Sequence, residues 1–316
     1  MVVFTFTNRI TFYKSYQSKF ILMTIKIYKS TLFILLSFSF YTNSSAQEAN
    51  CNYFNLPKPK KKPLPFNPKI LDLNGQFKYN VEFKTCDEIY FTTIDSRENI
   101  YFSKKENGKW STPKRASFSS AKYNDADPFL TKDNKRVYFI SKRPTHKDDT
   151  NLDFNIWYTD RKNGDWDSPK PLPNPINSDE NDEYFFSISN KNNVFFASNR
   201  KGGNGSFDIY TSKIIGDNKF STPKNIRSPI STEKYEFDPY ISPDENLMIF
   251  SINEKGNSSL FYSRKDKKAK WKTPKNLGDK INVTNQDFAP SLSPDGKFLF
   301  YSNNGKLMWV SSDILK

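Results

Sequence analysis

Four acidic residues recur at one position of successive chain segments and are the first candidates for chemistry. They are Asp125, Glu183, Glu236 and Asp287, which stand three residues before Pro128, Phe186, Pro239 and Pro290. Lys78 occupies the corresponding position of the first segment. Crowded carboxylates shift one another's pKa and attract positive groups, so these five side chains are candidates for a ligand or cation site at the mouth of a central channel. A residue that recurs with every repeat can instead cap the backbone of that repeat, and both interpretations remain open.

Other signatures of catalysis or metal binding are weak. His146 is the only histidine, and the sequence has no Gly-x-Ser-x-Gly stretch that would present a serine nucleophile. No Cys/His cluster has the spacing of a zinc site, and Asp148-Asp149 or Asn204-Gly205 alone are too little for a calcium loop. The run Gly202–Gly205 joins two expected strands instead of opening a helix, so it predicts a hairpin loop and not a phosphate cradle. We therefore expect no cofactor and no metal.

The elements that position these residues form a repeat of four short strands. In the segment 236–277, Ser242-Pro243-Asp244 predicts a turn between two strands, Leu260–Ser263 gives a third strand, and Pro274 is tolerable only in an outermost fourth strand. The same proline recurs at Pro113, Pro169 and Pro223, always three residues after an aromatic residue, namely Trp110, Trp166, Phe220 and Trp271. Second strands share the aromatic positions Phe91, Phe139, Phe196, Phe250 and Tyr301, and third strands begin with Ile100, Ile156, Ile209, Leu260 and Leu307. The repeats predict an all-β, five-bladed β-propeller of four-stranded antiparallel blades.

The ends of the chain suggest how the propeller closes. The fifth unit stops at Lys316 after its third strand, so residues 66–73 are expected to supply the missing strand and join the termini. We therefore expect the propeller to span 66–316, after a leader and signal peptide at 1–46 and a linker rich in proline and lysine at 47–65.

The first 46 residues have the features of an export signal. Lys26 and Lys29 precede the apolar run Thr31–Tyr41, and small residues end the segment at Ala46. The apolar run is shorter than a membrane span, so we expect cleavage after Ala46 and no transmembrane segment in the mature chain; an uncleaved anchor is the alternative. Residues 1–22 look like an upstream extension, with Met23 as the working start.

The formal charge of +14 and the two cysteines bear on location and partners. Five of the positive charges fall in the leader, and the basic residues elsewhere are scattered through turns, except for Lys58 and Lys60–Lys62. Alternating proline and lysine favours a solvated linker over a phosphate-binding patch, so we expect no nucleic acid partner. Cys51 and Cys86 would meet an oxidising compartment and could form a disulfide, whereas lipidation of Cys51 fits poorly because the preceding residues do not resemble a lipobox.

Several motifs resemble a known repeat. The motifs Ser293-Pro294-Asp295-Gly296-Lys297 before Phe298–Ser302, Asp208-Ile209-Tyr210 and Trp110-Ser111-Thr112-Pro113 resemble the TolB-type, WD40-like propeller repeat of exported bacterial proteins, of the kind common in Bacteroidetes. The resemblance covers residues 66–312, but Lys84–Asp87 and Ser189–Asn192 replace the Ser-Pro-Asp-Gly turn in two blades. It implies the fold more than the function, because members include translocation accessories, envelope scaffolds and propeller domains attached to peptidases.

Together these features predict a non-catalytic binding or scaffold module of the cell envelope. We expect a monomer in the periplasm or outside the cell, with association with the outer membrane as an alternative, whose partner is an envelope protein or a glycan. The alternative is a glycoside hydrolase or saccharide-binding propeller that uses the central carboxylates. Five aromatic residues precede inner strands without recurring, and they are candidates for the contact surface: Tyr123, Tyr184, Tyr235, Phe237 and Phe288.

Overall fold

The computed structural model describes residues 51–73 and 77–316, and residues 49–316 form one compact unit. The predicted leader and signal peptide lie outside the described residues. Within the described ranges, no helix is long and apolar enough to cross a membrane. The helices there are short 3-10 turns, η2 (Tyr53–Asn55), η3 (Lys69–Leu71) and η4 (Ser312–Leu315).

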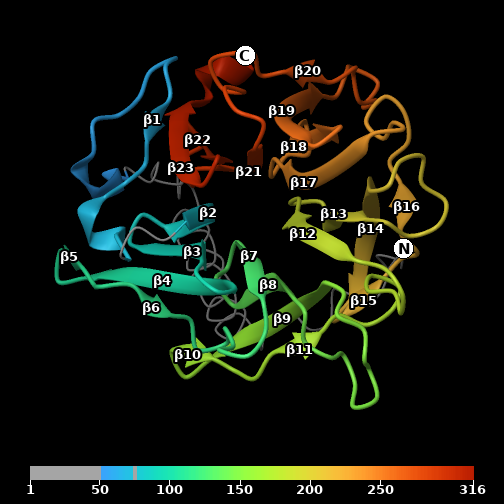
Figure 1. Ribbon diagram of the computed structural model, residues 1–316, viewed down its shortest axis with the longest axis horizontal. Helices are drawn as coiled ribbons and strands as arrows, with labels where there is room; N and C mark the ends of the chain where they lie inside the picture. The colour runs from blue at the N-terminus through green and yellow to red at the C-terminus, as the bar shows by residue number, and fades with distance from the viewer. Residues whose placement is uncertain (1–50, 74–76) are drawn as a thin grey trace, which may run out of the picture. The chain divides into compact units, whose positions relative to one another are not determined.

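Five antiparallel sheets surround a central axis, which confirms the predicted five-bladed propeller (Figure 1). Blade one contains β2 (Phe77–Thr85), β3 (Glu88–Ile94), β4 (Glu98–Glu106), β5 (Lys109–Trp110) and β6 (Lys114–Arg115). Blade two contains β7 (Asp125–Leu130), β8 (Arg136–Ser141), β9 (Asn155–Lys162), β10 (Asp165–Trp166) and β11 (Lys170–Pro171). Blade three contains β12 (Glu183–Ile188), β13 (Asn193–Ser198), β14 (Asp208–Gly216), β15 (Lys219–Phe220) and β16 (Lys224–Asn225). Blade four contains β17 (Tyr235–Ile241), β18 (Leu247–Glu254), β19 (Asn257–Arg264) and β20 (Lys275–Asn276), and blade five contains β21 (Asp287–Leu292), β22 (Phe298–Asn303), β23 (Lys306–Ser311) and β1 (Leu64–Pro65).

The outermost strand of blades one to three is split into two pieces on either side of the predicted proline. In blade one, β5 and β6 both pair with β4 and flank Pro113, which has no N–H to give to the ladder. A hydroxyl of the third strand donates to the carbonyl two residues before the proline and bridges the gap. The pairs are Ser103 to Ser111, Thr159 to Asp167, Ser212 to Ser221 and Ser263 to Lys272. This side-chain bond therefore recurs in four blades.

The propeller closes through an N-terminal strand, as predicted, but the residues differ from the prediction. Strand β1 pairs with β23, so that Leu64 faces Trp309, and the N–H of Phe66 donates to Leu307 at 2.8 Å (Figure 1). Of the expected range 66–73, residues 69–71 instead form η3. The closing strand lies within the proline-rich stretch that we expected to be a linker. Leu64 pairs with β23 although both of its neighbours in the sequence are prolines.

The segment before β1 is also part of the propeller. Cys51 is joined to Cys86 by a disulfide across 35 residues, which ties this segment to the hairpin between β2 and β3. Tyr53 is fully buried against Phe83, Phe298 and Trp309, which come from blades one and five. The ordered unit therefore begins at least 15 residues before the predicted boundary at residue 66.

The recurrent apolar positions form the cores between blades. The second-strand aromatics Phe91, Phe139, Phe196, Phe250 and Tyr301 are at most 1% exposed, and the third-strand residues Ile100, Ile156, Ile209 and Leu260 are fully buried. Each cluster joins neighbouring blades, as in the contact of Phe118 with Phe139. The repeat thus specifies the packing of one blade on the next.

Each inner strand contains a β-bulge at one equivalent residue. The bulged residues have φ between 42° and 53° and are Asn80, Asp127, Phe185, Asp238 and Ala289. They follow the recurrent acids, and Lys78, by two residues. Because a bulge inserts an unpaired residue, it changes the direction of the side chains that follow it along the strand.

Candidate functional site

The four predicted carboxylates cap loops within the propeller. Asp125, Glu183, Glu236 and Asp287 have no exposed surface and lie at the start of the inner strands β7, β12, β17 and β21. Each accepts a hydrogen bond from a backbone N–H three to five residues earlier, in the loop that enters its strand; the donors are Ser120, Ser178, Thr232 and Thr284. These contacts favour the capping interpretation over a ligand-facing ring. Lys78 lies in β2 opposite Thr93, and its side chain is outside the described set.

Two of these caps are strengthened by arginine. Arg143 donates to Asp125 at 2.7 Å and to the carbonyl of Phe118 at 2.6 Å, and it lies over the rings of Phe139 and Trp157. Arg200 donates to Glu183 at 2.9 Å and to the carbonyl of Pro175 in the same way.

The electrostatics of the four caps follow from their burial. Desolvation raises the pKa of all four carboxyls, and it raises the pKa of Glu183 to about 7 although Arg200 opposes the shift. Glu236 and Asp287 are bonded by neutral side chains instead, those of Thr232 and Asn303. Burying these carboxylates therefore costs free energy, and each carboxylate accepts a backbone hydrogen bond from the loop that enters its strand, which offsets part of that cost.

Two of the bulged residues are buried acids that sequence reasoning missed, Asp127 of blade two and Asp238 of blade four. Burial raises the pKa of both Asp127 and Asp238, and repulsion by Asp238 raises that of Asp127 further. Each is bonded by a residue of a neighbouring blade: Asn80 donates to Asp127 at 3.0 Å, and the N–H of Ala289 donates to Asp238 at 2.9 Å. Blades two and four thus each bury an acid at the bulge of the inner strand.

A run of aromatic rings crosses three blades beside the channel, and we call it the aromatic strip. It consists of Phe154, Tyr184, Phe207, Tyr235 and Phe237, whose successive ring centroids are 5.1, 5.1, 4.6 and 4.8 Å apart. Phe154 is buried, and the other four rings are partly exposed. Three of the five were predicted contact residues. Phe154 and Phe207 were missed, although each directly precedes a third strand.

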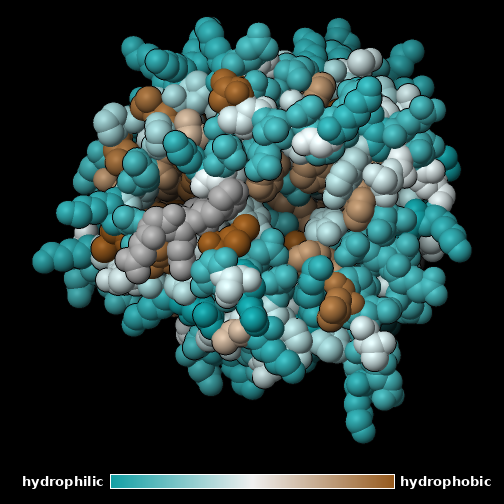
Figure 2. Space-filling model, viewed as in Figure 1, coloured by the Kyte–Doolittle hydropathy of each residue, from teal (hydrophilic) through white to brown (hydrophobic). Residues whose placement is uncertain are grey.

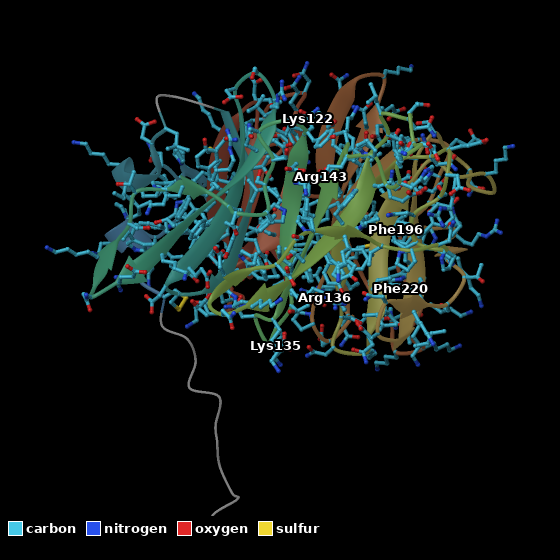
Figure 3. All side chains as sticks on the ribbon, turned by 90° about the horizontal axis from the view of Figure 1, so that it is seen from below. Lys122, Lys135, Arg136, Arg143, Phe196 and Phe220 are labelled. Carbon is cyan, nitrogen blue, oxygen red and sulfur yellow. A yellow bond between two sulfur atoms is a disulfide. The ribbon has the colours of Figure 1, made fainter. Side chains whose placement is uncertain are left out.

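The aromatic strip lies on the face that we call the mouth face, formed by the loops entering inner strands and those joining second to third strands. Figure 3 shows Lys122 and Arg143 toward this end of the sheets, and Lys135, from the hairpin between β7 and β8, at the other end. Figure 2 shows hydrophobic residues near the centre of one face inside a hydrophilic rim. The remaining predicted aromatics lie outside the aromatic strip: Phe288 packs on Tyr79, and Tyr123, in the loop that enters β7, has Lys122 over its ring.

Two loops longer than their counterparts adjoin the aromatic strip. In blade two, Asp149 accepts bonds from the N–H groups of Thr145 and Asn151, and the Asn151 side chain bonds to the carbonyl of Asp179. In blade three, a Cβ at Gly205 would lie 1.7 Å from the carbonyl oxygen of Lys234, so only glycine fits against the neighbouring loop. Both loops are held by specific contacts. His146 lies in the blade-two loop and lines a cavity of about 210 Å³.

Two polar cavities adjoin the two tyrosines of the aromatic strip. A cavity of about 390 Å³ beside Tyr184 is lined by Asn151, Leu152, Asp153, Glu180, Asp182 and Lys142. A cavity of about 770 Å³ beside Tyr235 is lined mainly by Ser206, Thr232, Glu233, Asn253, Glu254, Lys234 and Lys255. Leu152, in the lining of the first cavity, is 73% exposed. Among the described residues, no group of three or more His, Cys, Asp or Glu side chains is arranged to hold a metal ion.

Comparisons with known proteins support the fold. No family profile and no curated protein matches the sequence. Similar solved structures include TolB from Acinetobacter baumannii (18% identity, TM-score 0.46, 72% of this chain and 50% of that one) and a TolB from Agrobacterium tumefaciens (14%, 0.47, 72% and 69%). An α-L-arabinofuranosidase from Podospora anserina, solved with cellotriose, is 13% identical with a TM-score of 0.50, covering 81% of this chain and 97% of that one.

This chain spans half the length of the first TolB structure. The likeness to the arabinofuranosidase structure, at a TM-score of 0.50 and 13% identity, shows the fold alone. Structures of TolB are thus among those similar to this propeller, while membership of the TolB-type repeat family stays a prediction.

Proposed function

We propose that this protein is an exported binding propeller of the cell envelope, which holds an envelope protein or glycan on its mouth face over blades two to four. The observation that carries the proposal is that the departures from the repeat gather there. Two long loops, the aromatic strip and two polar cavities adjoin one another, whereas positions shared by all blades serve packing and capping. Binding sites commonly lie on loops that a rigid scaffold positions. The disulfide between Cys51 and Cys86 is consistent with an oxidising compartment outside the cytoplasm.

The test compares three forms of residues 47–316 immobilised and exposed to envelope extract. Wild type should retain a defined protein or saccharide, identified by mass spectrometry, and Tyr184→Ala/Tyr235→Ala should lose it. Tyr123→Ala is the matched control, because Tyr123 belongs to the mouth face but not to the aromatic strip, and it should bind like wild type. Equal retention by all three forms, with equal thermal stability, would refute the location of the site.

A second candidate function is glycoside hydrolysis, and the observation that favours it is the pair Asp127 and Asp238. A glycosidase needs two carboxyls with different protonation states, one acting as acid and the other as base or nucleophile. Burial raises the pKa of both, and the charge of Asp238 raises that of Asp127 further, which favours such a difference in this pair. A screen with aryl glycosides and natural glycans tests the idea. Turnover by wild type that disappears in both Asp127→Asn and Asp238→Asn would replace the binding proposal by an enzymatic one.

A further inference from the structure

The aromatic strip places four partly exposed rings side by side, with the buried Phe154 at one end. Four successive centroid spacings are between 4.6 and 5.1 Å, with interplanar angles of 31° to 50°; the rings come alternately from loops and inner strands up to Tyr235, and Phe237 follows it in β17. Aromatic side chains supply large apolar contact area at a low cost in side-chain entropy. A ligand that follows the strip must therefore present a repeated apolar face along its length.

The walls of the strip offer hydrogen bonds but little positive charge. The cavity beside Tyr184 contains three carboxylates, those of Asp153, Glu180 and Asp182, against the single ammonium of Lys142. In the cavity beside Tyr235, Glu233 and Glu254 balance Lys234 and Lys255, and Lys234 is paired with Glu254 at 2.7 Å, so the two cavities together hold more carboxylates than ammonium groups. The chain as a whole has a formal charge of +14, so this region departs from its surroundings. A polyanion would be repelled here, whereas hydroxyl groups would find carboxylate, amide and hydroxyl partners.

The backbone along the strip is not free to pair with an extended peptide. The N–H of Glu183 donates to the carbonyl of Phe154 at 2.8 Å, and that of Glu236 donates to the carbonyl of Phe207 at 3.1 Å. A parallel bridge also joins Phe207 to Tyr235. Since neighbouring blades use these groups, recognition of a peptide by strand addition is disfavoured.

We infer that the aromatic strip binds a linear, neutral oligosaccharide, whose sugar rings stack on the aromatic side chains while their hydroxyls bond to the two cavities. Pyranose rings combine an apolar C–H face with a hydroxyl rim, which matches a strip of aromatic rings between polar walls. This inference rests on the proposed binding function and assigns the chemical class of its ligand.

Isothermal titration calorimetry on residues 47–316 tests it, with tetra- to hexasaccharides of the cello-, xylo-, malto- and chito- series as neutral probes and oligogalacturonate as the anionic probe. Wild type should bind at least one neutral series and bind oligogalacturonate more weakly. Tyr184→Ala and Tyr235→Ala should each weaken neutral binding about tenfold, because each removes one stacking surface. Tyr123→Ala should leave the affinity unchanged.

A second variant guards against a folding defect in the tyrosine variants. Glu180 is exposed and lines the cavity beside Tyr184, so Glu180→Ala should keep the wild-type melting temperature and weaken neutral binding several-fold. Binding that prefers oligogalacturonate, or neutral binding unchanged in all strip variants, would overturn the inference. Strip-dependent capture of an envelope protein without binding of any neutral series would overturn the saccharide class and leave the proposed function standing. If the strip binds neither a neutral oligosaccharide nor an envelope protein, both the inference and the proposed function are refuted.

Discussion

Replacing Arg143 by methionine should lower the free energy of unfolding by about 3–5 kcal/mol, the usual cost of removing one partner of a buried ion pair. Asp125 is fully buried, and the side chain of Arg143 is 11% exposed and lies 2.7 Å from it. The variant would leave a carboxylate with no cation and would also free the carbonyl of Phe118. Methionine retains apolar contact with Phe139 and Trp157, so little of the loss comes from packing.

The companion variant Arg143→Met/Asp125→Asn should recover most of the lost stability, since a neutral amide needs no counter-charge. The effect of pH follows from the sign of the shift. Burial raises the pKa of the Asp125 carboxyl, and the positive charge of Arg143 opposes that rise. Without the arginine, the pKa of Asp125 in the folded protein should therefore lie further above its unfolded value. A raised pKa means stability that is present at low pH and is lost as pH rises toward the folded pKa. The difference between wild type and Arg143→Met should therefore be small near pH 4 and largest near pH 8.

Urea unfolding followed by tryptophan fluorescence at both pH values measures these differences. Arg97→Met is the matched control, because Arg97 donates to the carbonyls of Ala121 and Lys122 in the same loop without pairing to a buried carboxylate. It should cost about 1 kcal/mol. A cost below about 1 kcal/mol for Arg143→Met, or no recovery with Asp125→Asn, would contradict the capping role and revive a ligand-facing role for Asp125.

Three further outcomes are expected. Replacing Cys51 and Cys86 by serine should lower stability by up to about 4 kcal/mol, the loop-entropy value for a 35-residue separation, and reducing agent should then have no further effect on unfolding. Asp238→Asn should stabilise the protein at pH 8 by at most about 4 kcal/mol and change little at pH 4, because burial raises the pKa of this carboxyl to about 7; unfolding at both pH values tests the sign. N-terminal sequencing of protein from the envelope or medium should begin near Gln47, and a mature chain that retains Lys29 would contradict cleavage.

The repeats made the blades predictable because every blade uses the same packing chemistry. A buried aromatic such as Phe139 must recur wherever one blade meets the next, and Pro113 marks the outer edge where a missing N–H is tolerated. The closing strand was misplaced because its pairing depends on β23, which is distant in sequence, and because Leu64 lies among prolines that favour an extended linker. The burial of Tyr53 likewise depends on a surface that two distant blades form together.

The orientation of the recurrent acids could not be predicted for a different reason. The bulge two residues after each acid changes the direction of the side chains beyond it, and so changes which of them share a face with the acid. The bulged positions hold four different residue types, from Asn80 to Phe185 and Ala289, so this backbone feature leaves no clear sequence signal. The buried acids at the bulges, Asp127 and Asp238, were missed because they occur in only two of the five blades.

In this propeller, the residues that hold the blades together differ from the residues proposed to bind a ligand, and the repetition of the blades explains this difference. A side chain that recurs from blade to blade, such as the hydroxyl of Ser103 bonded across the gap beside Pro113, meets the same kind of neighbours in each of the four blades that have it, so its recurrence is explained by the blade itself. A ligand that is not itself five-fold symmetric needs contacts that differ from blade to blade. The residues that differ on the mouth face, including Tyr184, Phe207 and the exposed Leu152, cluster beside one part of the channel and not evenly around it. Irregularity in the repeat is therefore a better guide to this protein's site than recurrence.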